Sequence, residues 1–131
     1  MPSPYTRFLI VHQVSTLRRI VRSHLKQLGY QNVDEADDGA VALARLRSEE
    51  FGFVVADRNT PSMDGLTLVQ NIRADPQLTH IPVLLVTASA QKEFVLAAAQ
   101  AGANDYIVSP FAASAFADKL NGIFAKMQTT G

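Results

Sequence analysis

The stretch FVVADRNTPSMDG, residues 53–65, decides the fold. Its first four residues are continuously apolar, which predicts a buried strand, and Asp57 stands where that strand ends. The residues that follow, up to Asp64 and Gly65, are rich in turn formers and predict a loop that leads into a helix. The sequence therefore places one carboxylate at the rim of a core, beside a loop of defined shape.

Short apolar runs alternate with helical patterns on both sides of this stretch. They predict four further strands, at 8–11, 33–36, 82–86 and 106–108. Helical spacing of apolar residues predicts helices between the strands. One of them covers about 40–47, and we expect its inward residues to be Val41, Ala44 and Leu46. Strands separated by helices predict an α/β protein with a doubly wound parallel sheet covered on both faces.

Residues at the carboxyl ends of these strands are the candidates for function, because ligands of such sheets bind there. They are His12, Gln13, Asp57, Thr87 and Ser109. Asp57 is the one carboxylate at the end of a central strand, which favours a nucleophile or a metal ligand over a helix cap or turn residue. His12 can be a base, a metal ligand or a neutral polar spacer, and the sequence leaves these open.

Composition limits the class of protein. The chain has 131 residues, 47% of them hydrophobic, which suits the core of one domain. Twelve basic and twelve acidic residues give no net charge, so no general attraction to nucleic acid or anionic lipid is expected. The absence of cysteine excludes disulfides and thiolate chemistry. No signal peptide or membrane span is evident, and we expect a cytoplasmic protein that binds neither nucleic acid nor membrane.

Three separated segments resemble those of a response-regulator receiver domain. They are VVADRNTPSMDG at 54–65, PVLLVT at 82–87 and AGANDYIVSPF at 101–111. The likeness covers nearly the whole chain and is closest to the stand-alone chemotaxis regulators of the CheY type. It implies a flavodoxin-like sheet of five parallel strands in the order 2-1-3-4-5 with five helices. It also implies that residues 1–131 form a single receiver domain without an output domain.

The resemblance assigns roles to several residues. It implies that Asp57 accepts a phosphoryl group from a kinase histidine, that the Thr87 hydroxyl binds this group, and that Tyr106 reports it. It implies Mg²⁺ nearby, with Asp57 and the backbone carbonyl of Asn59 as its ligands in this chain. The Ser109–Pro110 bond falls where the family often has a cis peptide.

Three positions depart from the family's pattern. His12 and Gln13 stand where an acidic pair is expected, and Ser109 stands where a lysine is expected. Mg²⁺ prefers hard oxygen ligands with negative charge, so we expect weak Mg²⁺ binding. Because phosphoryl transfer depends on cations that stabilise the transferring group, the substitutions predict a slow reaction.

Three functional hypotheses follow. The first is a receiver in two-component signalling and chemotaxis that acts through partner binding, with Asp57 as its phosphoacceptor. The alternative is a pseudo-receiver, a protein-binding module that works without phosphorylation. The third, a metal-dependent phosphatase, requires more carboxylates than the strand ends supply. We therefore expect a signalling protein and not an enzyme.

The resemblance also implies a surface for partners. Lys92, Tyr106 and Lys119 occupy positions where chemotaxis regulators contact the flagellar motor switch. The expected partner is a sensor histidine kinase, the motor switch or another signalling protein, and the chain is expected to be a monomer. Ordinary solvation of exposed lysines is the alternative interpretation of these positions.

Overall fold

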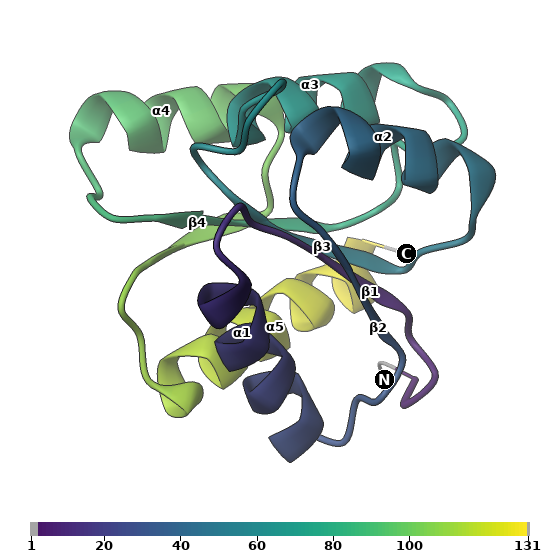
Figure 1. The fold of residues 1–131 in the computed structure, drawn as a ribbon, viewed down its shortest axis with the longest axis vertical. Helices are drawn as coiled ribbons and strands as arrows, with labels where there is room; N and C mark the ends of the chain where they lie inside the picture. The colour runs from purple at the N-terminus through teal and green to yellow at the C-terminus, as the bar shows by residue number, and fades with distance from the viewer. Residues whose placement is uncertain (1–2, 131) are drawn as a thin grey trace.

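The computed structural model describes residues 3–130 and, for side chains, residues 3–127. Strands and helices alternate throughout this part of the chain (Figure 1). The strands are β1 (Phe8–Val11), β2 (Val33–Ala36), β3 (Phe53–Asp57), β4 (Val83–Thr87) and β5 (Asp105–Val108). The helices are α1 (Ser15–Gln27), α2 (Gly39–Ser48), α3 (Gly65–Ala74), α4 (Lys92–Ala101) and α5 (Ala113–Thr130).

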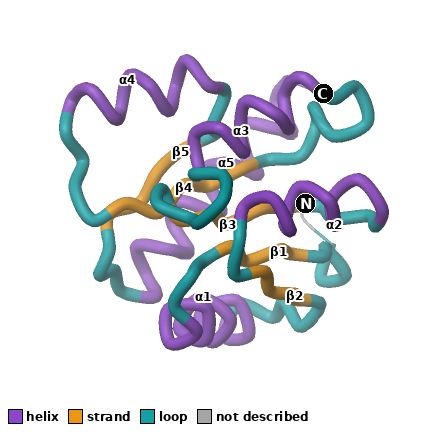
Figure 2. Tube along the Cα trace, turned by 45° about the horizontal axis from the view of Figure 1, so that its top comes forward, coloured by secondary structure: helices purple, strands orange, loops and turns teal. Residues whose placement is uncertain are grey.

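The five strands form one parallel sheet in the order β2-β1-β3-β4-β5, which confirms the predicted fold class. Helices α2, α3 and α4 cover one face of the sheet, and α1 and α5 cover the other (Figures 1 and 2). Strand order reverses between β1 and β3, since the chain continues from β1 toward one edge and from β3 toward the other. In doubly wound sheets this reversal marks the site where ligands bind.

The core has two halves because alternate residues of each strand face opposite sides of the sheet. Leu9, Val54 and Leu85 belong to the half beneath α2, α3 and α4. Phe8 and Phe53 belong to the half beneath α1 and α5, where their rings lie 5.2 Å apart. The central strands are buried on both faces, which explains why they read as continuous apolar runs.

Helix α2 corrects one prediction. Val41 and Ala44 are exposed, whereas Leu46 is buried as expected. The Asp38 side chain accepts hydrogen bonds from the amides of Ala40 and Val41 and so caps the helix. The buried stripe is then Gly39, Ala42, Leu43 and Leu46. Alanine is small enough for either face, so the apolar pattern alone did not determine how this helix is rotated.

Two further observations concern the chain as a whole. Among the described helices, none is long and apolar enough to cross a membrane. The Ser109–Pro110 peptide bond is cis, as the resemblance to the family implied.

Candidate functional site

The carboxyl ends of β1, β3 and β4 lie side by side and gather the predicted residues. Asp57 is the last residue of β3, and in the sheet it pairs with Val86 of β4. The Ser109 amide donates a 2.8 Å hydrogen bond to the backbone carbonyl of Thr87. The parallel register therefore brings His12, Asp57, Thr87 and Ser109 to one edge of the sheet, whereas the side chain of Gln13 is exposed.

His12 contacts Asp57 directly. Its Nε2 lies 3.3 Å from Oδ1 of Asp57, and both side chains are largely buried. Its Nδ1 accepts a 2.9 Å hydrogen bond from the backbone amide of Val14. Because an amide can only donate, Nδ1 carries no proton, and the proton of the imidazole resides on Nε2, where it points toward Asp57. Both ring nitrogens are thereby occupied.

The second oxygen of Asp57 is also bound. Oδ2 accepts a 2.9 Å hydrogen bond from the backbone amide of Asn59. Burial by itself would raise the pKa of Asp57, but the hydrogen bonds from His12 and from the Asn59 amide outweigh it and hold the pKa below its ordinary value. The carboxylate is therefore ionised at neutral pH.

Arg18 holds the loop that carries His12. Its Nη1 donates hydrogen bonds to the backbone carbonyls of His12, at 2.6 Å, and Gln13, at 3.3 Å. Its Nε donates to Glu35 Oε1 at 2.8 Å, which fixes the guanidinium. Sequence reasoning missed this residue, and its only signal was a cation in the first turn of a helix that follows the candidate loop.

The loop after β3 is shaped by close backbone packing. A Cβ on Gly65 would lie 2.6 Å from the carbonyl oxygen of Asp57, so only glycine fits there. Asp64 accepts a hydrogen bond from the Thr67 amide and caps α3. Arg58 stacks on the ring of Phe94, with its guanidinium carbon 4.4 Å from the ring centre. Arg58 therefore does not supply a charge to Asp57.

The side chains of Thr87 and Tyr106 make contacts on β4, β5 and the neighbouring helices. The Thr87 side chain is buried, and its hydroxyl donates a 2.9 Å hydrogen bond to the carbonyl of Ser89. The ring of Tyr106 is partly buried and stands edge-on to Phe94. Lys119 Nζ lies 5.0 Å from the Tyr106 ring centre and forms a 3.1 Å ion pair with Asp105. Lys92 is exposed at the start of α4.

The side chains present do not fit Mg²⁺. Asp57 is the only carboxylate that the sequence places at these strand ends, and His12 directs an N–H at it. Within the described residues, no three His, Cys, Asp or Glu side chains gather in a way that could hold a metal ion. Mg²⁺ demands several oxygen ligands and sheds its water reluctantly, which this donor set does not support.

A small cavity of about 80 Å³ adjoins the site. It runs from His12 and Asp57 between α1 and the segment from Ser109 to Phe111. Its remaining walls are aliphatic side chains, among them Leu17 and Ile20 of α1. This cavity could not be predicted from the sequence, because it depends on how two distant segments pack.

Comparisons with known proteins agree with this geometry. The family model described as the response regulator receiver domain matches residues 8–121. Chemotaxis protein CheY-3 of Vibrio cholerae is 50% identical over 121 residues, covering 92% of this chain and 93% of that protein. Chemotaxis protein CheY of Pseudomonas aeruginosa is 46% identical, covering 92% and 98%. The structure of chemotaxis response regulator CheY4 of Vibrio cholerae superposes with a TM-score of 0.84 at 28% identity, covering 91% of this chain and 98% of that one.

Proposed function

This chain belongs to the response regulator receiver family as a CheY-like receiver domain of chemotaxis signalling, and on that premise we propose that Asp57 is its phosphoacceptor. Such receivers are signalling proteins and not classical enzymes. The observation that carries the proposal is the state of Asp57. It is an ionised, partly buried carboxylate at the end of a central strand, and its recorded ion-pair partner is His12, not a lysine or arginine.

The reaction follows from the carboxylate's surroundings. An Asp57 oxygen attacks the phosphorus of a phosphohistidine, the phosphorus–nitrogen bond breaks, and the imidazole leaves with that electron pair. The product is an acyl phosphate on Asp57. The Asn59 amide and His12 Nε2–H point at the carboxylate and hold the attacking group in place.

The same surroundings make the reaction slow. In the contacts that the described residues make, the carboxylate faces the imidazole of His12 and the amide of Asn59, and no lysine or arginine. Each missing stabiliser of this kind costs about 2–4 kcal/mol of transition-state binding. We propose that His12 supplies part of this stabilisation.

A conformational change caused by phosphorylation of Asp57 would be transmitted to the surface through Thr87 and Tyr106. In the present structure the Thr87 hydroxyl is bound to Ser89. Turning it toward a phosphoryl group on Asp57 breaks those bonds and moves the loop before α4. Phe94 of α4 contacts Tyr106, so this loop movement would change the packing of the Tyr106 ring.

The proposed partner surface consists of Lys92, Tyr106 and Lys119, on α4, β5 and α5. The partner we propose is a sensor histidine kinase, the flagellar motor switch or another cytoplasmic signalling protein, bound by a monomer of this chain. Tyr106→Ala and Lys119→Ala should each weaken binding to such a partner, measured by calorimetry, while Lys26→Ala on α1 should not. Unchanged binding in both variants would rule out this surface.

Intact-protein mass after incubation with acetyl phosphate tests the phosphoacceptor. We expect a phosphoryl adduct on the wild type and on Asp37→Asn, a matched change of an exposed carboxylate, but none on Asp57→Asn. Absence of any adduct would favour a binding module that works without phosphorylation. An adduct that persists in Asp57→Asn would place the acceptor elsewhere.

A further inference from the structure

The cavity beside Asp57 has two chemically different ends. His12, Asp57 and Ser109 form its polar end. The walls leading away from it are aliphatic, and Ile20, at the side of α1, is 41% exposed to solvent. A ligand that fits both ends has an apolar chain and a single polar head.

The negative charge of Asp57 determines which kind of polar head group the cavity would bind. Asp57 is ionised, and among the described residues its carboxylate contacts the imidazole of His12 and the backbone amide of Asn59, and no lysine or arginine. The nearest candidate cation in the sequence, Arg58, is held on the Phe94 ring. The hydrogen bonds favour the ionised carboxylate but bring no lysine or arginine to it, and a positive head group would add a favourable charge–charge interaction.

From these observations we propose that the cavity is a binding site for a primary alkylammonium group, with the ammonium at Asp57 and the alkyl chain between α1 and Phe111. A volume of about 80 Å³ admits a slender alkyl chain. The head has three N–H donors, and the Asp57 carboxylate offers acceptor positions beyond the two already used. This inference goes beyond the proposed function, since it requires the Asp57 anion and not its phosphorylation.

Two sources present this chemistry. One is a free alkylamine, and the other is the lysine side chain of a partner protein, which carries the same ammonium on a four-carbon stem. The experiment therefore has two arms, n-butylammonium chloride and Nα-acetyl-lysine methylamide. Stronger binding in the first arm identifies a small-molecule site, and equal or stronger binding in the second identifies a lysine-reading site.

The test is a titration followed by amide NMR of the full chain at constant ionic strength. We expect saturable shifts at the amides of Val14, Asn59 and Phe111, with a dissociation constant of about millimolar for so small a ligand. n-Butanol, which lacks the charge, and tetramethylammonium, which lacks N–H donors and a chain, should each bind about tenfold more weakly or worse. Shifts that do not saturate, or that centre on the carboxylates elsewhere, would overturn the proposal.

Variants separate the two ends of the site. Asp57→Asn should weaken n-butylammonium about tenfold, because it removes the charge and keeps the shape. Ser109→Leu should abolish binding by filling the cavity while leaving the charge, with Ser114→Leu on α5 as the matched control. Ile20→Trp, at the mouth, gives an independent block if Ser109→Leu does not fold. Unchanged binding in Asp57→Asn, or in both cavity-filling variants, would contradict the assignment.

The outcome of the amine-binding experiment is independent of the outcome of the phosphoacceptor test. Amine binding is measured on the unphosphorylated chain, and adduct formation is measured without amine. Binding without an adduct would reject the phosphoacceptor and keep the amine site, and an adduct without binding would do the reverse.

Discussion

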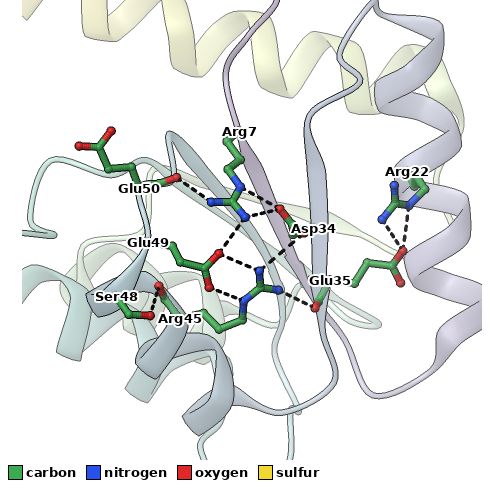
Figure 3. Close-up of polar contacts among 8 residues, drawn as sticks. All are labelled: Arg7, Arg22, Asp34, Glu35, Arg45, Ser48, Glu49 and Glu50. Atoms are coloured by element: carbon green, nitrogen blue, oxygen red, sulfur yellow. Dashed lines mark hydrogen bonds and ion pairs between the residues drawn. The ribbon is translucent and has the colours of Figure 1, made fainter.

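Two groups of charged residues lie at opposite ends of the same sheet and differ in how their carboxylates are paired. At the amino ends of β1 and β3, Arg7 and Arg45 pair with Asp34 and Glu49, an arrangement we call the arginine network (Figure 3). Both guanidinium groups also lie over the ring of Phe51, at 4.3 and 5.5 Å. At the carboxyl ends, the recorded ion pair of Asp57 is with His12.

This difference distinguishes carboxylates that stabilise the fold through ion pairs from the Asp57 carboxylate, which is held in place but keeps its charge. In the arginine network every carboxylate is neutralised by guanidinium groups, which holds β2, α2 and the loop before β3 together. Asp57 is held in place by N–H donors but keeps a net negative charge at a site open to ligands. Carboxylates that keep a reactive charge are therefore those that the fold positions without neutralising.

The largest expected effect comes from removing His12, the ion-pair partner of Asp57 among the described residues. His12→Ala deletes the Nε2–H donor, and we expect the rate of phosphoryl acceptance from acetyl phosphate to fall about tenfold to a hundredfold. Time-resolved intact mass measures this rate. His80→Ala, at an exposed position in the loop before β4, is the control. A His12→Ala rate equal to wild type would show that the imidazole is only a spacer.

A substitution in the arginine network is expected to lower stability and to leave phosphoryl acceptance unchanged. Arg45→Met keeps the aliphatic stem but removes a guanidinium that pairs with Asp34 and Glu49. We expect the free energy of unfolding in urea to fall by about 1 kcal/mol, because these pairs are partly exposed. Phosphoryl acceptance should remain at the wild-type level. Arg19→Met, at an exposed position of α1, should change neither the free energy of unfolding nor the rate of phosphoryl acceptance. Loss of acceptance in Arg45→Met would remove the distinction between the two regions.

A smaller, pH-dependent effect is expected at Glu49. The hydrogen bonds from Arg45 and Arg7 lower the pKa of Glu49 to about 2. Because the folded pKa lies below the ordinary value of 4.5, the stabilisation is present above pH 4.5 and is lost as the pH falls toward 2. Urea titrations across this range should show a steeper loss of stability in the wild type than in Glu49→Gln. Parallel curves would mean that the network adds no stability in this way.

Much of the site was predictable because parallel strands end at one edge. Apolar runs located the strands, so Asp57, Thr87 and Ser109 could be placed together before any contact was known. The roles of Arg18 and Arg58 could not be predicted, since one binds loop carbonyls and the other a ring on a distant helix. Such contacts depend on side-chain rotamers and tertiary packing, which residue spacing does not encode.

The sequence predicted His12 as a site residue but could not predict its role. The sequence left it as a base, a ligand or a spacer. Its bond from the Val14 amide fixes which nitrogen carries the proton, and therefore that it donates to Asp57. That choice depends on the conformation of a short loop, and no residue pattern specifies it.

The central claim is that Asp57, the carboxylate at the end of β3, accepts a phosphoryl group in a pocket whose side chains do not fit Mg²⁺, so that acceptance does not depend on this ion. The most direct test is intact mass after acetyl phosphate, in EDTA and in excess Mg²⁺, for wild type, Glu49→Gln and Asp57→Asn. We predict equal adducts on wild type and Glu49→Gln in both conditions, and none on Asp57→Asn. An adduct that forms only with Mg²⁺, or one that survives in Asp57→Asn, would contradict the account.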